Sequence, residues 1–239
     1  MPRFFIESPL AAGQSIELPE AVCRHVQVLR LAPGDVVTLF DGSGGEYEAR
    51  IDDIGKKRVA ATLGAHLAVE RESLLAITLV QAVSSGDRMD YTLQKAVELG
   101  VTAIVPVISE RSVVRLSGER ADKRVQHWQG VVQSACEQCG RNRVPSVAPL
   151  LSFEGWLRSA QAAGTRFMLS PQGRGRLREL SPVGELALLA GPEGGLTAAE
   201  ETAALASGWQ PLLLGPRILR TETAAVATIA ALQALWGDV

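Results

Sequence analysis

The sequence contains little cysteine and no long apolar run, and both features narrow what the protein can be. Its 239 residues include three cysteines, Cys23, Cys136 and Cys139, an odd and sparse set typical of reduced thiols in the cytosol. No stretch approaches the roughly 20 apolar residues of a membrane span. Residues 1–7 reach a charge and a proline before a secretory signal could form. We therefore expect a cytoplasmic protein with no membrane partner.

The spacing of the cysteines disfavours a metal site. Cys136 and Cys139 make a lone Cys-x-x-Cys, and His127 is the only histidine on the same predicted helix, whereas structural zinc needs four ligands. A redox pair would lie at the start of a helix, where the thiolate is stabilised, but this pair precedes Gly140 near a helix end. We interpret the two cysteines as small residues packed on a helix and expect no metal.

The glycine-rich fingerprints of phosphate binding are also missing. The sequence has no Gly-x-Gly-x-x-Gly after a strand and no Gly-x-x-x-x-Gly-Lys-Ser/Thr, which disfavours a Rossmann-type dehydrogenase. A net charge of -2 and a pI near 6.0 lack the basic footprint of a strong non-specific binder of nucleic acid. Arginine nevertheless outnumbers lysine 20 to 4, and its planar fork suits phosphates. Basic residues gather between 111 and 143 and at Arg166, Arg174, Arg176 and Arg178.

Two glycine-punctuated loops organise the last fifty residues. The apolar run 186–190 is typical of a strand buried on both faces of a parallel sheet, and the loop 191–195 follows it. Thr197 and Glu200 then stand at the spacing of a capping box, so we expect a helix that ends near residues 207–208. Glycine-rich loops at the carboxyl ends of parallel strands let the backbone approach a ligand, which indicates a small-molecule site.

The second loop lies between another strand and the terminal helix. We expect that strand over about 211–214 and predict Thr221 as the N-cap of the last helix. The apolar residues Ala225, Ile229, Leu232 and Trp236 fall on one face of this helix.

The rest of the chain predicts two domains. Residues 1–70 read as a small, mostly β domain, with a short helix whose Val22, Val26 and Leu29 share a face, followed by three strands. Residues 74–239 alternate strands with helices, which implies an α/β fold with a parallel sheet. The expected elements are strands at 36–40, 45–51, 58–63, 74–83, 103–108 and 166–169, and helices at 87–99, 121–139 and 153–163.

The two loops and several other stretches closely resemble the SPOUT methyltransferases, and within them the RsmE family, which methylates N3 of a uridine in 16S ribosomal RNA. The similar stretches are Gly191-Pro-Glu-Gly-Gly195, Leu214-Gly-x-x-Ile-Leu-Arg-x-Glu-Thr-Ala224, His25-Val-x-Val-Leu-Arg30, Gly34-Asp35, Asp41-Gly-x-Gly44, Lys95-x-x-Glu-Leu-Gly100, Arg111-Ser-Val-Val114 and Glu137-Gln-x-Gly-Arg-Asn-Arg-x-Pro145. This ordered set covers nearly the whole chain.

The resemblance implies an amino-terminal PUA-like β-barrel domain, a carboxy-terminal SPOUT domain with a trefoil knot, and a homodimer. It also implies S-adenosylmethionine as cofactor and 16S rRNA in the small ribosomal subunit as partner. The cofactor residues that it implies are Leu169, Ser170, Pro171, Gly191, Pro192, Glu193, Gly194, Gly195, Leu214, Gly215, Ile218, Leu219 and Thr221. The RNA-binding residues that it implies are Arg24, His25, Arg30, Arg111, Arg115 and Arg143.

Arg220, Glu193 and Arg141 are the residues that we assign to catalysis. Arg220 is expected to face RNA phosphate or the uracil oxygens, and its alternative is an ion pair with Glu222 or Glu193. Glu193 is a general base if burial raises its pKa, or it accepts backbone N–H groups and holds its loop. Arg141, with Glu137 and Asn142, is assigned to the nucleotide side of the site, and helix-capping or surface roles stay open for all three.

Two other functions compete with this one. A relative within the SPOUT enzymes could methylate another RNA or a ribose 2'-oxygen, because no motif specifies the methylated atom. A non-catalytic RNA-binding assembly factor is disfavoured by the intact loops, since it has no need of a cofactor pocket.

Overall fold

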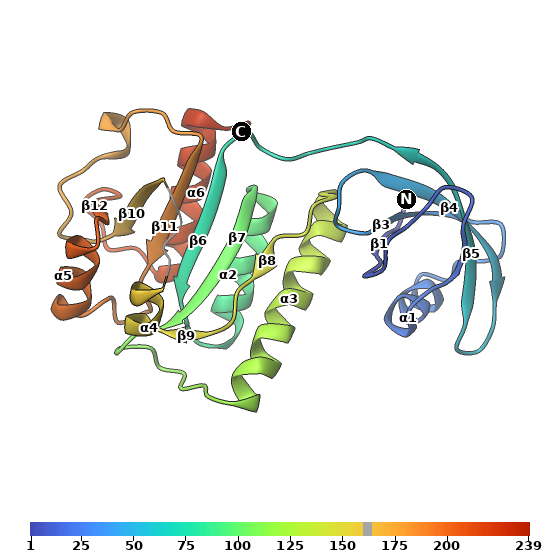
Figure 1. The fold of residues 1–239 in the computed structure, drawn as a ribbon, viewed down its shortest axis with the longest axis horizontal. Helices are drawn as coiled ribbons and strands as arrows, with labels where there is room; N and C mark the ends of the chain where they lie inside the picture. Colours follow the sequence, from blue (N-terminus) through green and yellow to red (C-terminus); the bar gives the residue numbers. More distant parts are fainter. Residues whose placement is uncertain (160–163) are drawn as a thin grey trace. The chain divides into compact units, whose positions relative to one another are not determined.

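The computed structural model describes residues 1–159 and 164–239, and the chain packs as two units (Figure 1). The first contains Met1–Glu72 and Cys136–Val144, and the second contains Ser73–Ala135 and Pro145–Val239. The sequence analysis also divided the chain near residue 70, but it left 136–144 in the second part. These residues cluster with the first unit because their side chains bond to it, as described below.

The first unit is built on a five-stranded sheet with the order β1-β3-β4-β5-β2. β1 and β3 are parallel, and the other neighbours are antiparallel. Its elements are β1 (Arg3–Phe5), β2 (Ser15–Glu17), α1 (Glu20–Val28), β3 (Val36–Phe40), β4 (Glu46–Ile54) and β5 (Val59–Leu67). The sequence predicted the three long strands and α1, but β1 and β2 have three residues each and carry no periodicity to recognise.

The helix α1 attaches to this sheet through one apolar stripe. Val22, Cys23 and Val26 are buried in the core of the unit, as their spacing on a helix dictates. Leu29 was predicted on the same face, and that prediction is wrong: the helix ends at Val28 and Leu29 is 51% exposed. Arg30 then adopts a left-handed backbone with φ of 56°, which turns the chain away from the helix axis.

The second unit is a seven-stranded sheet flanked by helices, and its strand pairs are all parallel. The strand order is β12-β10-β11-β6-β7-β8, and β9 also pairs with β7. The strands are β6 (Ala76–Ala82), β7 (Val101–Ile108), β8 (Ser146–Val147), β9 (Leu151–Ser152), β10 (Thr165–Leu169), β11 (Glu185–Ala190) and β12 (Gln210–Leu212). The helices are α2 (Gly86–Glu98), α3 (Glu119–Cys139), α4 (Phe153–Arg158), the short 3-10 helix η1 (Leu177–Glu179), α5 (Ala198–Ala206) and α6 (Thr221–Trp236).

Helices cover both faces of this sheet. Val80 of β6 lies in a core cluster with residues of α4 and α5. The next residue, Gln81, points to the opposite face because successive side chains of a strand alternate, and it donates a hydrogen bond to Thr221 at the start of α6. α6 also packs against α2. The alternating α/β fold and the parallel sheet are therefore confirmed.

The cores of the helices follow the predicted patterns with small corrections. Ala225, Ile229 and Leu232 of α6 are buried, whereas Trp236 at its end is only partly buried. The helix predicted over 153–163 ends at Arg158, and its last predicted residues, 160–163, lie outside the described residues. Among the described residues, none of the helices has the length and apolarity to cross a membrane.

Candidate active site

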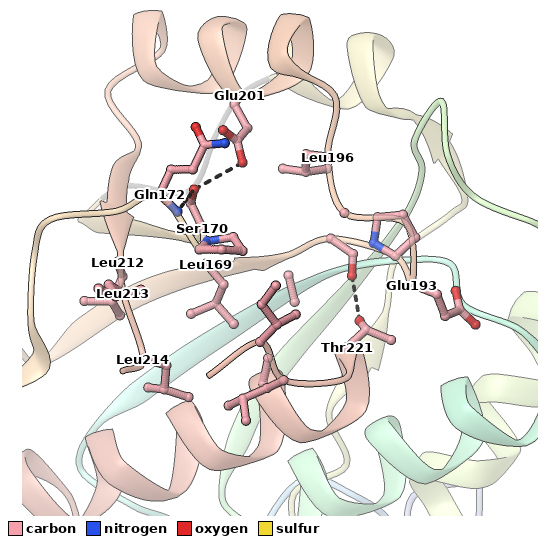
Figure 2. Close-up of a pocket in the computed structure, with 18 of the residues that line it drawn as sticks. Leu169, Ser170, Gln172, Glu193, Leu196, Glu201, Leu212, Leu213, Leu214 and Thr221 are labelled. Carbon is pink, nitrogen blue, oxygen red and sulfur yellow. Dashed lines mark hydrogen bonds between the residues drawn. The ribbon is translucent and has the colours of Figure 1, made fainter. Parts of the chain in front are cut away.

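A cavity of about 550 Å³ opens at the carboxyl ends of β10, β11 and β12 (Figure 2). These three strands are parallel neighbours, so the segments that follow them meet at one edge of the sheet, where α/β proteins bind ligands. Every residue that the sequence analysis assigned to cofactor binding lines this cavity. The structure thus gathers the predicted set, and its role in binding stays a prediction. Also in the lining are Arg111, Gln172, Ala190, Leu196, Glu201, Leu212, Leu213, Pro216, Arg217 and Ala224.

Glycine is required at two positions of the first loop by close packing. A Cβ on Gly191 would lie 3.1 Å from the backbone nitrogen of Leu196. A Cβ on Gly194 would lie 3.2 Å from the Cβ of Arg111. Both separations are tighter than ordinary van der Waals contact, so a side chain at either position displaces the loop.

Thr221 connects the first loop to the terminal helix. Its hydroxyl donates to the carbonyl oxygen of Gly191 at 2.6 Å and accepts from the side-chain amide of Gln81 at 3.2 Å. The prediction that Thr221 is the N-cap of α6 is wrong, because Arg220 occupies that position and Thr221 is the first helical residue. The hydroxyl is used for the loop instead of for the helix end.

Glu193 anchors the first loop to the start of α2. One carboxylate oxygen accepts from the N–H of Ser85 at 2.9 Å, from the hydroxyl of Ser85 at 2.7 Å and from Arg88 at 3.1 Å. Burial by itself would raise the pKa of Glu193, but these hydrogen bonds outweigh it and hold the pKa below its usual range. Figure 2 shows the carboxylate pointing away from the cavity.

This geometry does not meet the condition on which Glu193 was predicted as a general base. A base needs a carboxylate whose pKa is raised toward the working pH, whereas the pKa of Glu193 is lowered. The contacts support the other predicted role, in which Glu193 accepts a backbone N–H group and holds the loop in place.

Arg111 contacts the same loop from the segment that follows β7. It follows β7, and its guanidinium donates to the carbonyl oxygen of Gly194 at 3.0 Å and to that of Leu196 at 3.4 Å. The resemblance assigned Arg111 to RNA. Its place in the cavity wall was not predicted, because Arg111 is more than eighty residues from the loop in sequence.

The polar end of the cavity contains Ser170, which the sequence analysis predicted, together with Gln172 and Glu201, which it did not. The hydroxyl of Ser170 donates to the carboxylate of Glu201 at 3.2 Å and accepts from the N–H of Gln172 at 3.2 Å (Figure 2). Glu201 lies in the first turn of α5, where an acidic residue is expected for its favourable interaction with the helix dipole. The helix position alone explains an acidic residue here, so no signal in the sequence indicates that Glu201 also lines the cavity.

Arg220 is exposed at the N-cap of α6. In the described part of the chain its guanidinium has neither a hydrogen bond nor an ion pair, and Arg220 is not part of the cavity lining. The predicted alternative, an ion pair with Glu193 or Glu222, is not formed: Glu193 pairs with Arg88, and one carboxylate oxygen of Glu222 is buried with no partner among the described residues. A cation next to the second glycine loop is therefore available to a ligand.

Arg141 has a structural environment in the first unit. It is 4% exposed, and its guanidinium forms an ion pair with Glu72, with Nε 3.1 Å from a carboxylate oxygen. Its neighbour Asn142 is fully buried and bonds to the carbonyl oxygen of Val69 at 2.6 Å. Arg141 is absent from the cavity lining. These contacts give the guanidinium of Arg141 a structural role within the first unit, and its assignment to catalysis stays a prediction.

Glu137, Cys136 and Cys139 lie in the same segment as Arg141, at the end of α3. The carboxylate of Glu137 accepts from the N–H of Phe5 at 2.9 Å, so it ties the end of α3 to β1. Burial raises the pKa of the Cys136 thiol to about 12. A thiol that stays protonated at neutral pH is inert, which agrees with Cys136 as a packed residue.

The residues predicted to bind RNA are exposed in both units. Arg24, His25 and Arg30 lie on or just after α1, and Arg143 is exposed in the same unit beside Glu70. Arg111 and Arg115 are exposed in the second unit, where Arg115 donates to the carbonyl oxygen of Glu110 at 2.8 Å. Their exposure is compatible with RNA contact, and contact itself stays a prediction.

Comparison with known proteins assigns this fold and site to a class. A family model described as an RNA methyltransferase domain matches residues 70–233, and one described as an RNA methyltransferase PUA domain matches residues 18–64. The chain is therefore an RNA methyltransferase with a small amino-terminal PUA domain.

Relatives that match this chain over nearly its whole length identify the family within the RNA methyltransferases. The ribosomal RNA small subunit methyltransferase E of Buchnera aphidicola (subspecies Acyrthosiphon pisum) is 31% identical over 100% of this chain and 95% of its own. A crystal structure of the same-named protein from Neisseria gonorrhoeae, bound to S-adenosyl methionine, is 49% identical with a TM-score of 0.95 over 100% and 99% of the two chains. A Legionella pneumophila structure with bound S-adenosyl methionine is 38% identical, with a TM-score of 0.95 over 99% and 98%. The chain belongs to the ribosomal RNA small subunit methyltransferase E family, and its second unit has the SPOUT fold.

The anchoring role of Glu193 predicts a pH-dependent stability. At neutral pH, Glu193→Gln is expected to lower the free energy of unfolding of the second unit by about 1 kcal/mol, because charge-assisted hydrogen bonds to a partly exposed carboxylate are lost. A carboxylate with a lowered pKa stabilises above its ordinary value of 4.5 and loses this effect as the pH falls through its folded pKa. The difference between parent and variant should therefore vanish in acid, as measured by urea denaturation and by hydrogen exchange at the Ser85 amide.

The matched control is Glu154→Gln. Glu154 is 83% exposed and also pairs with an arginine, Arg158, so its removal should leave stability nearly unchanged. An equal effect of the two substitutions at neutral pH would contradict the anchoring role of Glu193.

Proposed function

We propose that the protein transfers a methyl group from S-adenosylmethionine to N3 of a uridine in the 16S rRNA of the small ribosomal subunit, in the cytoplasm. The observation that carries this proposal is the cavity, which is lined by both glycine loops at the carboxyl ends of three parallel strands. Support comes from the Neisseria gonorrhoeae relative, which is named as a small subunit methyltransferase and binds S-adenosyl methionine.

The residues of the cavity fit this cofactor. The volume, about 550 Å³, lies in the range of roughly 300–1,000 Å³ that ligand pockets show. Leu214, Ile218 and Leu219 offer apolar surface for an adenine, and Ile218 is 86% exposed, so a bound ring would cover it. The polar end of the cavity, formed by the carboxylate of Glu201 and the hydroxyl of Ser170, is suited to hydroxyl or ammonium groups of the ligand. The close packing at Gly191 and Gly194 keeps the loop backbone where a ligand meets it.

The chain contributes positioning and electrostatics to the reaction. S-Adenosylmethionine, when bound, supplies an electrophilic methyl group on its sulfonium. Glu193 and Arg111 hold the first loop from two sides, which fixes the wall of the cavity and thereby the position of the bound methyl donor. In this proposal Arg220 stabilises negative charge on the uracil oxygens once N3 has lost its proton, and its position next to the second loop without a partner among the described residues supports that role.

RNA contact is proposed for both units. The exposed basic residues of the first unit, Arg24, His25 and Arg30, present donors for phosphates, and Arg143 adds another. Because the PUA domain carries more acidic than basic residues, its contact with RNA must use one local face.

A homodimer and a trefoil knot also stay proposals. The dimer is supported by α6, which has a single charged residue, Glu222, and apolar side chains on its outer side as well as its inner side. Leu235 of this helix is 49% exposed. A helix that is apolar on all sides is normally covered by another element, and a second copy of the chain would cover it.

Methylation of small ribosomal subunits tests the proposed reaction. Purified protein, S-adenosylmethionine and subunits that lack the modification are incubated, and the digested RNA is analysed by mass spectrometry. We expect N3-methyluridine. A 2'-O-methylated nucleoside would replace the proposal with another SPOUT activity. Cofactor binding without a methylated nucleoside in ribosomal RNA would direct the search to transfer RNA, whereas the absence of both cofactor binding and a methylated nucleoside would favour the non-catalytic RNA binder.

Arg220→Ala separates catalysis from cofactor binding. We expect a loss of about 10²–10³ in the single-turnover rate, as when one preorganised donor to a developing negative charge is removed. Affinity for S-adenosylmethionine, measured by calorimetry, should be unchanged because Arg220 does not line the cavity. Arg220→Lys, which keeps the charge, should retain part of the rate. An undiminished rate in the alanine variant would refute the role.

Sedimentation tests the proposed dimer. The parent protein is expected to sediment as a dimer, and Leu235→Arg as a monomer, because a buried unpaired charge opposes association. Leu205→Arg is the matched control, since Leu205 lies on α5 and is similarly exposed, at 46%. A monomeric parent, or equal behaviour of the two variants, would count against α6 as the interface.

A further inference from the structure

The segment that follows β10 has a regular alternation that the proposed function does not use. Residues 173–178 read Gly-Arg-Gly-Arg-Leu-Arg. Gly173 is buried, and Gly175 and Leu177 are partly buried, whereas Arg174, Arg176 and Arg178 are all exposed. Over residues 173–176 this alternation is the pattern of an extended chain lying on a surface, and Arg178 follows in the short 3-10 helix η1.

Backbone contacts fix this segment against β12. Gly175 forms a parallel bridge with Leu212, and its carbonyl oxygen accepts from the N–H of Leu213 at 2.9 Å. The N–H of Gly173 donates to the carbonyl oxygen of Ser170 at 3.0 Å. β12 is the edge strand of the sheet, and Figure 1 shows the orange segment between β10 and β11 running beside it. The segment therefore occupies the edge of β12, and its course is set by main-chain bonds.

The two glycines are required by this contact. A Cβ on Gly173 would lie 2.9 Å from the carbonyl carbon of Leu212, a separation that real Cβ atoms do not show, and one on Gly175 would lie 3.2 Å from the carbonyl oxygen of Pro211. The chain thus lies directly on the backbone of β12. Arg174 and Arg176, which flank Gly175, must project from the same outer side, roughly 6–7 Å apart along an extended chain.

The three guanidiniums are not used within the protein. Across the residues that the structure describes, Arg174, Arg176 and Arg178 form no ion pair and donate no side-chain hydrogen bond. The acidic residue nearest in sequence is Glu179, which is itself exposed. Two of these guanidiniums lie on the segment that is fixed against β12 and the third follows in η1, and together they make a local concentration of positive charge in a chain whose net charge is -2.

The segment adjoins the cavity at both of its contacts. Gln172, directly before Gly173, lines the cavity, and so do Leu212 and Leu213, which bond to or bridge Gly175. The arginines therefore extend from the rim of the cavity. A substrate whose reacting group enters the cavity must pass its neighbouring groups over this rim.

We propose that Arg174, Arg176 and Arg178 form a phosphate-binding track for the RNA strand that carries the target nucleotide. Guanidinium groups bind phosphate oxygens through paired N–H donors, and a row of them fits a polyanion with one charge per residue. The proposal rests on the proposed function, which brings RNA to the cavity, and it adds the element that grips the backbone beside it. The competing explanation is that charges on this segment merely protect a sheet edge from association.

The test compares two double variants of equal charge. Arg174→Gln/Arg176→Gln removes two charges from the track. The control, Arg158→Gln/Lys123→Gln, removes two from the helices α4 and α3 of the same unit, where the side chains are 76% and 71% exposed. Neither pair changes a buried residue or a glycine, and melting temperatures verify the fold. The probe is the small ribosomal subunit that lacks the modification, titrated at several potassium chloride concentrations.

We expect the track variant to bind subunits about tenfold or more weaker than the control. Its plot of log K against log salt should be shallower by about 1.4–1.8, since each lost phosphate contact removes roughly 0.7–0.9 from the slope. The KM for subunits should rise, while kcat and the affinity for S-adenosylmethionine stay at parental values. Arg174→Lys/Arg176→Lys should keep most of the salt slope and lose part of the affinity, because lysine lacks the fork.

Equal affinity and slope in the track and control variants would overturn the proposal. Self-association of the track variant with unchanged affinity for subunits would do so too, in favour of edge protection. A parent protein that binds S-adenosylmethionine yet neither binds nor methylates subunits would refute the proposed function and this inference together. An active parent with an unaffected track variant would refute the inference alone.

Discussion

The hydroxyl of Thr221 links three parts of the second unit that are far apart in sequence. It bonds to the carbonyl oxygen of Gly191 at the start of the first glycine loop and to the side chain of Gln81 in the central part of the sheet, and it begins the terminal helix directly after the second loop. The hydroxyl of Thr221 therefore fixes the positions of both loops that shape the cavity relative to each other. Glu193 and Arg111 complete this constraint by fixing the outer end of the first loop.

Local signals in the sequence predicted the elements that depend on local physics. The capping box of Thr197 and Glu200 is formed with both of its bonds, because its partners are three residues apart and need no tertiary context. The apolar run of β11 and the loop after it were also predicted from local sequence alone. Once these pieces lie at the ends of parallel strands, the cavity follows, and the resemblance to a known family predicted part of its lining, although not Gln172 or Glu201.

Roles that depend on a distant partner could not be derived in this way. Arg141 bonds to Glu72, sixty-nine residues away, and Glu193 bonds to Ser85, one hundred and eight residues away. The sequence alone does not show whether a charged residue in a motif faces a substrate or a buried counter-ion. Only the fold distinguishes these two environments. The exposed Leu29 is a smaller case, since a single residue of difference in where α1 ends decides whether it is covered.

The cavity is built to hold a ligand by shape and backbone more than by charge. Of its four charged wall residues, Glu193 bonds to Ser85 and Arg88, and Arg111 bonds to two carbonyl oxygens of the loop, which leaves Glu201 and Arg217. What faces the interior is chiefly leucine and main chain, with the carboxylate of Glu201 at one end. This explains why the sequence has no phosphate fingerprint: the cofactor that the family implies carries no phosphate. Among the arginines without a side-chain partner in the described part of the chain, Arg217 lines the cavity, whereas Arg174, Arg176, Arg178 and Arg220 lie outside its lining. Most of the cations available to the phosphates of the proposed RNA substrate are therefore outside the cavity.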